Sequence, residues 1–238
     1  GYKLGCYTSP HLQDYNERVR LNGLPVTDDA LCAAFARVEA ARLQAGNVAL
    51  TYFEFGTLAA WEVFAAAEVE AVILEVGLGG RLDAVNVYES DISIVTTVAL
   101  DHTDWLGNDR ESIGFEKAGI YRSGKPAFCA DPHPPQTLLD HAAAIGADLR
   151  LIGRDFGFER PSAETNENRL QWRWWCRSGD HLIKRALAYP GLRGPTQLYN
   201  ASVALAALEA LGNQLPVTMQ AIRPGLIETE LVGRFQVV

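Results

Sequence analysis

The sequence lacks paired cysteines, long apolar segments and an excess of basic residues. Its four cysteines show no CxxC spacing, which argues against a zinc motif or disulfide framework and favours reduced core cysteines: Cys6, Cys32, Cys129 and Cys176. No apolar run approaches the ~18 residues that suggest a membrane-spanning helix, and residues 1–10 lack the layout of a signal peptide. These absences predict a cytoplasmic protein with no membrane partner.

The charge balance restricts the class of partner. The formal net charge is −8, and sequence-independent nucleic-acid binding requires a basic footprint, so we expect no nucleic-acid partner. Charged residues make up 21% and hydrophobic residues 48% of the chain, as in ordinary globular proteins. A chain of 238 residues accommodates one large domain, or a domain with a small appendage. An anionic substrate would therefore need local positive groups or a metal ion.

Strand-like and helix-like patterns alternate along the chain. Nearly continuous apolar runs of strand length are AVILEVGL, at 71–78, and DISIVTTVAL, at 91–100. Helices are predicted from Thr27 to Gln44, over 53–67, and from near Asp109 through Lys117. This alternation predicts an α/β fold with a doubly wound, mostly parallel sheet that is covered by helices on both faces.

The pattern changes at residues 169–188, which predict an appended β-hairpin around a turn at 178–180. Its interleaved Arg and Trp residues suggest stacking of single-stranded nucleic acid as one interpretation. Strand alternation instead places Leu170, Trp172, Trp174 and Cys176 on one face, and we favour this packing interpretation. A helix from about Pro195 to Leu211 and a shorter one at 217–226 follow.

Glu75 lies near the end of the first strand and His102 follows the second apolar run, at the strand edge where open α/β sheets bind ligands. A carboxylate at the end of an apolar strand needs a partner, a metal ion or a proton, and Arg81 or a backbone amide is the structural alternative. A histidine and a carboxylate suit zinc, manganese or iron as well as magnesium. The pair predicts a metal or proton-transfer site without identifying the ion.

The glycine-rich segment 77–80 follows a strand, but as a dinucleotide-binding fingerprint it is weak because Leu82 replaces the third glycine. A tight turn that lets a substrate approach the backbone is the alternative, with Asp83 available to bind a polar heterocycle. No GxxxxGK[ST] phosphate loop occurs in the chain.

Seven segments, taken in order, resemble the folylpolyglutamate synthase and dihydrofolate synthase family, within the Mur-type ATP-dependent amide ligases. They are YTSPHL (7–12), NERVRLNG (16–23), TYFEFGTLAAW (51–61), EVGLGGRLDAVN (75–86), ALDHTDWLG (99–107), ESIGFEKAGI (111–120) and LYNASVALAAL (198–208). The resemblance implies that ATP converts a substrate carboxylate to an acyl phosphate, which the amine of an amino acid then attacks to form an amide.

The same resemblance implies a Mg²⁺ site at Ser9, Glu75 and His102, and a carbamylated lysine at Lys117. Lys117, His102 and Glu75 are thus the expected catalytic residues. Magnesium neutralises phosphate charge, and a lysine carbamate supplies an anionic oxygen pair. The structural alternatives are that Ser9 caps a turn and that Lys117 pairs with Glu111 or Glu116 on a helix surface.

The remaining sites that the resemblance implies are a pterin pocket and a nucleotide site. The pocket comprises Thr51, Phe53, Asp83 and Ala84, and the nucleotide contacts are Asn200 and Arg234. An aromatic face and a carboxylate suit a flat hydrogen-bonding ring, and an arginine suits a phosphate. The alternatives are that Phe53 is ordinary core and that Asn200 caps the following helix.

The function predicted from the resemblance is ATP-dependent addition of L-glutamate to dihydropteroate, tetrahydrofolate, or both, by a monomer. Another Mur-type amino-acid ligase and a non-catalytic folate- or nucleotide-binding remnant are the alternatives. We expect residues 1–216 to form a Mur-ligase-like central domain, and 217–238 a terminal helix and linker towards a further domain. Without an upstream phosphate loop and that domain, the segment alone is expected to be inactive.

Overall fold

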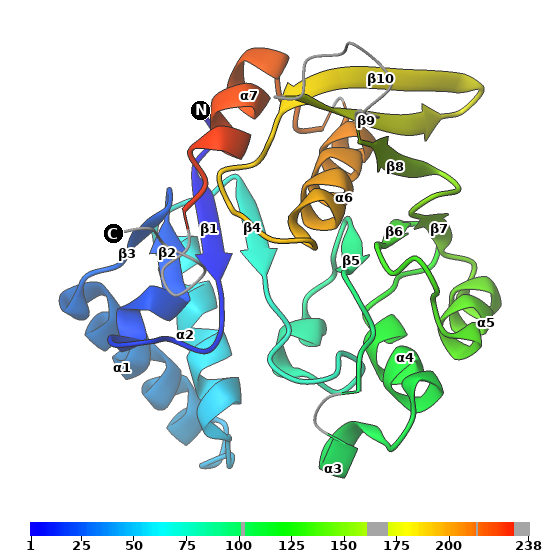
Figure 1. Ribbon diagram of the computed structural model, residues 1–238. Helices are drawn as coiled ribbons and strands as arrows, with labels where there is room; N and C mark the ends of the chain where they lie inside the picture. Colours follow the sequence, from blue (N-terminus) through cyan, green and yellow to red (C-terminus); the bar gives the residue numbers. More distant parts are fainter. Residues whose placement is uncertain (101–102, 161–170, 213, 231–238) are drawn as a thin grey trace. The chain divides into compact units, whose positions relative to one another are not determined.

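The computed structural model describes residues 1–100, 103–160, 171–212 and 214–230. The chain divides into two compact units, Gly1–Glu89 and Ser90–Val238 (Figure 1). Each unit has its own sheets, helices and hydrophobic core, and is considered by itself below.

The first unit is built on a four-stranded sheet of order β3-β2-β1-β4. Its strands are β1 (Leu4–Tyr7), β2 (Val19–Leu21), β3 (Leu24–Pro25) and β4 (Ala71–Leu74). β1 and β4 are parallel, with Tyr7 opposite Leu74, so both strands end at the same edge. β2 turns into β3 through Asn22 and Gly23, whose positive φ values of 51° and 85° suit a tight hairpin turn.

Two helices, α1 (Asp28–Gln44) and α2 (Tyr52–Ala66), lie side by side in this unit (Figure 1). Thr27 caps α1 through its hydroxyl, which accepts a hydrogen bond from the Ala30 N–H at 3.3 Å. The Phe35 and Phe55 rings join the helices, with centroids 5.8 Å apart. The unit also contains the 3-10 helices η1 (Tyr15–Arg18) and η2 (Ala84–Val87).

The second unit contains a parallel sheet of order β5-β6-β7. The strands of this sheet are β5 (Ser93–Val95), β6 (Pro126–Cys129) and β7 (Asp148–Leu151). Three helices lie in the same stretch of the chain, α3 (Thr103–Leu106), α4 (Arg110–Ala118) and α5 (Gln136–Ile145). The Glu111 carboxylate on α4 accepts hydrogen bonds from the Gln136 and Thr137 N–H groups at 3.2 and 2.9 Å. α4 therefore supplies the acidic cap at the N-terminus of α5.

An antiparallel sheet of order β10-β9-β8 completes the second unit, and α6 lies along one of its faces (Figure 1). The elements are β8 (Phe156–Glu159), β9 (Gln171–Ser178), β10 (His181–Ala188), α6 (Gln197–Leu211) and α7 (Met219–Ile227). Trp172, Trp174 and Cys176 are buried together in the core under α6. The packing interpretation of these residues is confirmed. Leu170, which was expected on the same face, lies outside the described residues.

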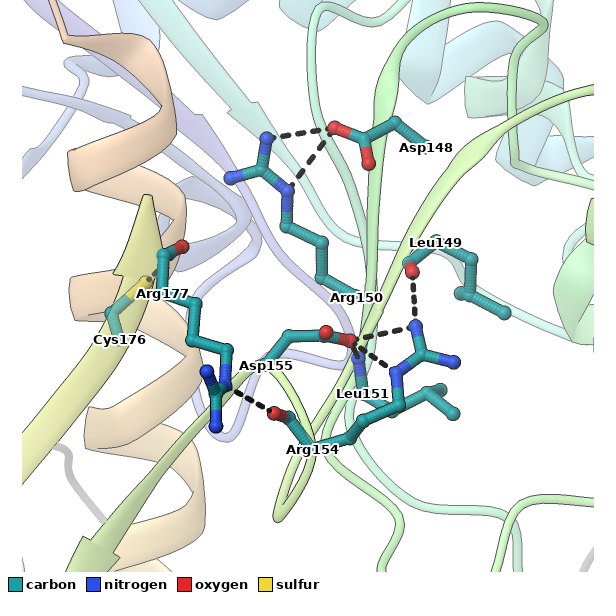
Figure 2. Close-up of polar contacts among 8 residues, drawn as sticks. All are labelled: Asp148, Leu149, Arg150, Leu151, Arg154, Asp155, Cys176 and Arg177. Atoms are coloured by element: carbon teal, nitrogen blue, oxygen red, sulfur yellow. Dashed lines mark hydrogen bonds and ion pairs between the residues drawn. The ribbon is translucent and has the colours of Figure 1, made fainter. Parts of the chain in front are cut away.

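Polar side chains join β7 to the antiparallel sheet (Figure 2). The Asp155 carboxylate accepts hydrogen bonds from the Leu151 N–H at 2.7 Å and from Arg154 Nε at 2.8 Å. Arg177 of β9 donates through Nε to the Arg154 carbonyl at 3.2 Å. These contacts hold the turn between β7 and β8 and give Arg154 and Arg177 structural partners. Arg150 has its own partner in Asp148, at 2.7 Å.

The predicted α/β class is confirmed, as are the hairpin turn and helix α1. Of the predicted mostly parallel sheet, β5, β6 and β7 form a parallel sheet, whereas the sheet that contains β1 and β4 is mixed. The hairpin is less of an appendage than expected, because β8 joins it and its inner face contributes to a main core cluster. The expectation of four core cysteines is wrong for Cys32, which is exposed, whereas Cys129 and Cys176 are buried. No helix in the described part of the chain is long and apolar enough to span a membrane.

Candidate functional site

Ser9 and Glu75 lie together at the edge where β1 and β4 end. Parallel pairing brings the two strand ends together, and the Glu75 N–H donates to the Tyr7 carbonyl at 2.9 Å. The Glu75 carboxylate in turn accepts a hydrogen bond from the Ser9 N–H at 2.8 Å. Glu75 is exposed rather than buried in an apolar strand. The cost of desolvating its carboxylate therefore does not explain why it has a partner. The backbone amide that was one of its expected alternatives is present.

The loop that carries Ser9 is held by Glu17, a residue that the sequence did not single out as functional. Both oxygens of its carboxylate accept backbone hydrogen bonds, from Leu12, Gln13 and Asp14 at 2.9, 2.9 and 3.0 Å. These bonds lower the pKa of Glu17 from 4.5 to about 2. The sequence offered one signal for this role, an acidic residue in the first turn of a short helix. The three backbone partners of Glu17 depend on how the loop folds and could not be predicted.

Asp83 organises the glycine-rich loop. Its Oδ2 accepts hydrogen bonds from the Gly77 and Leu78 N–H groups at 3.0 and 2.9 Å, and its Oδ1 accepts one from Val85 at 3.0 Å. The amides that a phosphate-binding turn would offer are thus bonded to a carboxylate. This agrees with the weakness of the dinucleotide-binding motif. Gly79, with φ of 71°, supplies the tight turn inside the loop.

Phe53 lies against this loop. A Cβ atom added to Gly77 would come within 2.7 Å of the Phe53 ring, so glycine is what allows the ring and the backbone to approach. Phe53 is partly buried and also packs on the core of the unit, with its ring centroid 5.7 Å from that of Tyr7. The structure therefore brings together Phe53, Gly77 and Asp83, and Ala84 follows as the first residue of η2.

Thr51 has a defined structural role as the N-cap of α2. Its hydroxyl accepts a hydrogen bond from the Glu54 N–H at 3.2 Å, and the Glu54 carboxylate accepts one from the Thr51 N–H at 2.7 Å. This reciprocal capping box fixes the start of the helix that carries Phe53. Thr51 is itself exposed, so its side chain is accessible from solvent.

Lys117 lies in the last turn of α4, a partly buried position in the second unit. The helix begins where expected, with Asp109 Oδ1 accepting a hydrogen bond from the Ser112 N–H at 2.7 Å. Glu111, one of the two alternative partners considered for Lys117, accepts hydrogen bonds from the backbone at the start of α5.

Asn200 lies on α6 in the second unit and is exposed. Its position inside the helix, with its N–H bonded to the Thr196 carbonyl, excludes the capping alternative, because Thr196 is the N-cap residue. His102 and Arg234 lie outside the described residues. Within the described part of the chain, no group of three or more His, Cys, Asp or Glu side chains is placed to hold a metal ion.

Comparisons with known proteins cover the whole chain. A curated dihydrofolate synthase/folylpolyglutamate synthase of Escherichia coli (strain K12) is 47% identical over 238 residues, and one from Haemophilus influenzae is 40% identical over 238 residues. Each alignment takes in 100% of this chain and 52% or 50% of the relative. The chain thus spans about half the length of these relatives. No family model matches the chain.

Solved structures agree with the sequence comparison. A structure described as E. coli FolC in complex with DHPP and ADP has a TM-score of 0.86 and 46% identity, covering 100% of this chain and 53% of that one. The folylpolyglutamate synthase of Thermotoga maritima has a TM-score of 0.83 and 31% identity, covering 100% of this chain and 54% of that one. Identity and fold agree over the full length of the chain, which belongs to the dihydrofolate synthase/folylpolyglutamate synthase family.

Proposed function

We propose that the chain is part of an ATP-dependent ligase that adds L-glutamate to dihydropteroate, tetrahydrofolate, or both. The observation that carries the proposal is 47% identity across all 238 residues to a curated dihydrofolate synthase/folylpolyglutamate synthase. Similar structures are described as complexes with DHPP and ADP, and with Mn, AMPPNP and L-glutamate. Together they support a nucleotide, a divalent cation, a pterin acid and glutamate as ligands of the complete protein.

In the proposed reaction, a carboxylate oxygen of the pterin substrate attacks the γ-phosphorus of ATP, and ADP leaves. The amine of glutamate then attacks the acyl carbon, the amide bond forms, and phosphate and a proton are released. Residues of this chain would bind and orient the reactants for both steps. We retain the proposed domain limits of 1–216 and 217–238, and the monomeric state, as part of this proposal.

The residues at the end of β1 and β4 fit a hard divalent cation. Ser9 offers a hydroxyl and Glu75 an exposed carboxylate, and oxygen donors are what Mg²⁺ prefers. His102 is the proposed third ligand. A bound Mg²⁺ would neutralise phosphate charge there, while the hydrogen bond between Glu75 and the Ser9 N–H fixes the spacing of its two donors.

Phe53, Asp83, Ala84 and Thr51 form the proposed pterin pocket. Phe53 offers a ring face, and Asp83 keeps acceptor capacity because a carboxylate has about four lone-pair positions and three are used here. Asn200 and Arg234 are the proposed nucleotide contacts. Asp83 would both shape the loop and accept hydrogen bonds from the pterin ring.

The pocket is tested in a chimera in which this chain replaces the matched segment of the Escherichia coli relative. We expect Phe53→Leu to raise the KM for dihydropteroate by about tenfold, because one stacked aromatic contact is lost. Phe55→Leu, which alters a neighbouring ring on α2 that packs on Phe35, is the matched control and should leave this KM unchanged. ADP release that depends on dihydropteroate and glutamate is the measurement. A parent chimera that uses a UDP-linked acid and not dihydropteroate would establish the alternative Mur-type function.

Lys117 is the proposed site of carbamylation, which would convert a cation into an anionic oxygen pair. Arginine preserves the positive charge but cannot form a carbamate, so Lys117→Arg should keep the fold and reduce kcat by about a hundredfold or more. Lys125→Arg is the control, because Lys125 is an exposed lysine of the same unit paired with Asp91 at 3.0 Å. Full activity of the Lys117→Arg chimera would exclude the carbamate.

A further inference from the structure

A buried carboxylate lies just after β6, at a residue to which no role has been assigned above. Asp131 is 5% exposed, and both of its oxygens are bonded. Oδ2 accepts a hydrogen bond from the Val98 N–H at 2.8 Å, and Oδ1 accepts one from the His133 N–H at 2.8 Å. Asp131 therefore joins the segment after β5 to the segment after β6 within the second unit.

Arg110, the first residue of α4, completes the arrangement. Its Nη2 lies 2.9 Å from Asp131 Oδ2 and also donates to the His133 carbonyl at 2.9 Å. Its Nε donates to the Val98 carbonyl at 2.8 Å. Both backbone polar groups of Val98, a residue only 3% exposed, are thus held by one ion pair.

The ion pair fixes two segments that lead to proposed functional residues. Val98 lies three residues after β5 and four before His102, which is outside the described residues. Lys117 lies seven residues after Arg110 on α4, or about two helical turns. A planar guanidinium holds several acceptors at fixed angles, whereas a lysine ammonium does so with much less geometric definition.

Burying a carboxylate is costly, and a buried ion pair is often no more stabilising than apolar residues of similar volume. This pair holds the backbone after β5, the backbone after β6 and the start of α4 at once. Its main effect is therefore to select one conformation of these three segments rather than to add stability. We propose that Arg110 and Asp131 are positioning residues of the ligase, setting the backbone around Val98 and the start of the helix that presents Lys117. They touch no substrate. The catalytic part of this inference rests on the proposed function. The contacts that Arg110 and Asp131 make with the backbone of Val98 and His133, called the clamp below, do not depend on it.

The clamp is tested in the chain as it stands, by amide hydrogen exchange. Asp131→Asn removes the negative charge with little change of shape. Arg110→Lys keeps the positive charge but loses the planar guanidinium and its several N–H donors. Each should speed exchange of the Val98 N–H by at least about tenfold, because a buried bond to a charged acceptor is weakened. Asp148→Asn and Arg150→Lys are matched controls. They make the same changes in an ion pair confined to β7 (Figure 2), whose carboxylate is more exposed than that of Asp131, and should leave the exchange of the Val98 N–H unchanged.

The catalytic part is tested by the same four substitutions in the chimera. Arg110→Lys and Asp131→Asn should lower kcat by about tenfold or more, while the KM for dihydropteroate, whose proposed pocket is in the other unit, stays within about twofold. The two control variants should keep the parental kcat. A merely structural pair would lower the amount of folded enzyme without changing kcat per folded molecule.

Three results separate the possible failures. Unchanged exchange at Val98 in both variants would overturn the clamp. Faster exchange with unchanged kcat in an active parent chimera would overturn the positioning role and leave the proposed function intact. A folded parent chimera with no ligase activity would overturn the proposed function and the catalytic part of this inference with it, while the exchange data still decide on the clamp.

Discussion

Single carboxylates organise the loops of the first unit. Glu17 holds the segment 12–14 through three backbone amides, and Asp83 holds 77–85 through three more. In each case a charged acceptor collects N–H groups that a short loop cannot satisfy itself. Residues that a motif marks for ligand binding can therefore be required first for the shape of the loop, and substitution at Asp83 will report on both roles.

Glu17 gives a pH-dependent prediction. Its pKa is lowered from 4.5 to about 2 by its backbone hydrogen bonds, so the folded state prefers the ionised form. The stabilisation is complete above the unfolded-state pKa and is lost as pH falls from about 4.5 towards 2. The Tm of the parent should exceed that of Glu17→Gln at neutral pH, and the difference should shrink as pH falls below about 4.5.

Thermal unfolding followed by circular dichroism at a series of pH values gives this difference directly. Glu62→Gln is the control, because Glu62 is partly buried and its carboxylate accepts a hydrogen bond from Arg37 on a neighbouring helix rather than from loop amides. A Tm difference for Glu17→Gln that stays constant down to acidic pH would show that the carboxylate charge does not hold the loop.

Elements with strong local patterns were predictable, and those defined by long-range pairing were not. β9 alternates buried and exposed residues, and its turn is marked by Gly179, so the hairpin followed from sequence. β2 and β3 are three and two residues long, too short for any pattern. They exist because β1 offers a partner edge to β2, and β2 offers one to β3. The apolar pattern of the strand before Glu75 also allowed a ligand site to be predicted at the end of β4. The hydrogen bonds of Asp83 could not be predicted, because they depend on the folded shape of the loop.

The two faces of β9 predict unequal effects of tryptophan substitution. Trp172 is fully buried and its indole N–H donates to the Ala188 carbonyl at 2.9 Å, whereas Trp175 lies on the opposite face and is only partly buried. Trp172→Ala should lower the free energy of unfolding by about 3–5 kcal/mol, with a smaller loss for Trp175→Ala. Urea denaturation followed by circular dichroism is the measurement. Equal losses would show that alternation does not separate the faces.

At the scale of the whole molecule, the chain divides into two compact units, with the boundary along the chain between residues 89 and 90. The alternating pattern shows that strands and helices form but not which strands share a sheet, because parallel partners are joined through long crossovers. β4 and β5 follow each other along the chain and belong to different sheets. Sheet membership was therefore the part of the fold that local sequence could not supply.

Separate cores predict separate responses to core substitutions. Phe64, 1% exposed, belongs to a cluster made only of first-unit residues, and Phe156, fully buried, belongs to one made only of second-unit residues. Each Phe→Ala change should remove about 3–5 kcal/mol from the unit that contains it. Hydrogen exchange read by mass spectrometry at increasing urea should show Phe64→Ala lowering the unfolding midpoint of peptides from 1–89 more than that of peptides from 90–230. Phe156→Ala, the matched change, should show the reverse. If both changes shift all peptides equally, the two units unfold as one cooperative body despite their separate cores.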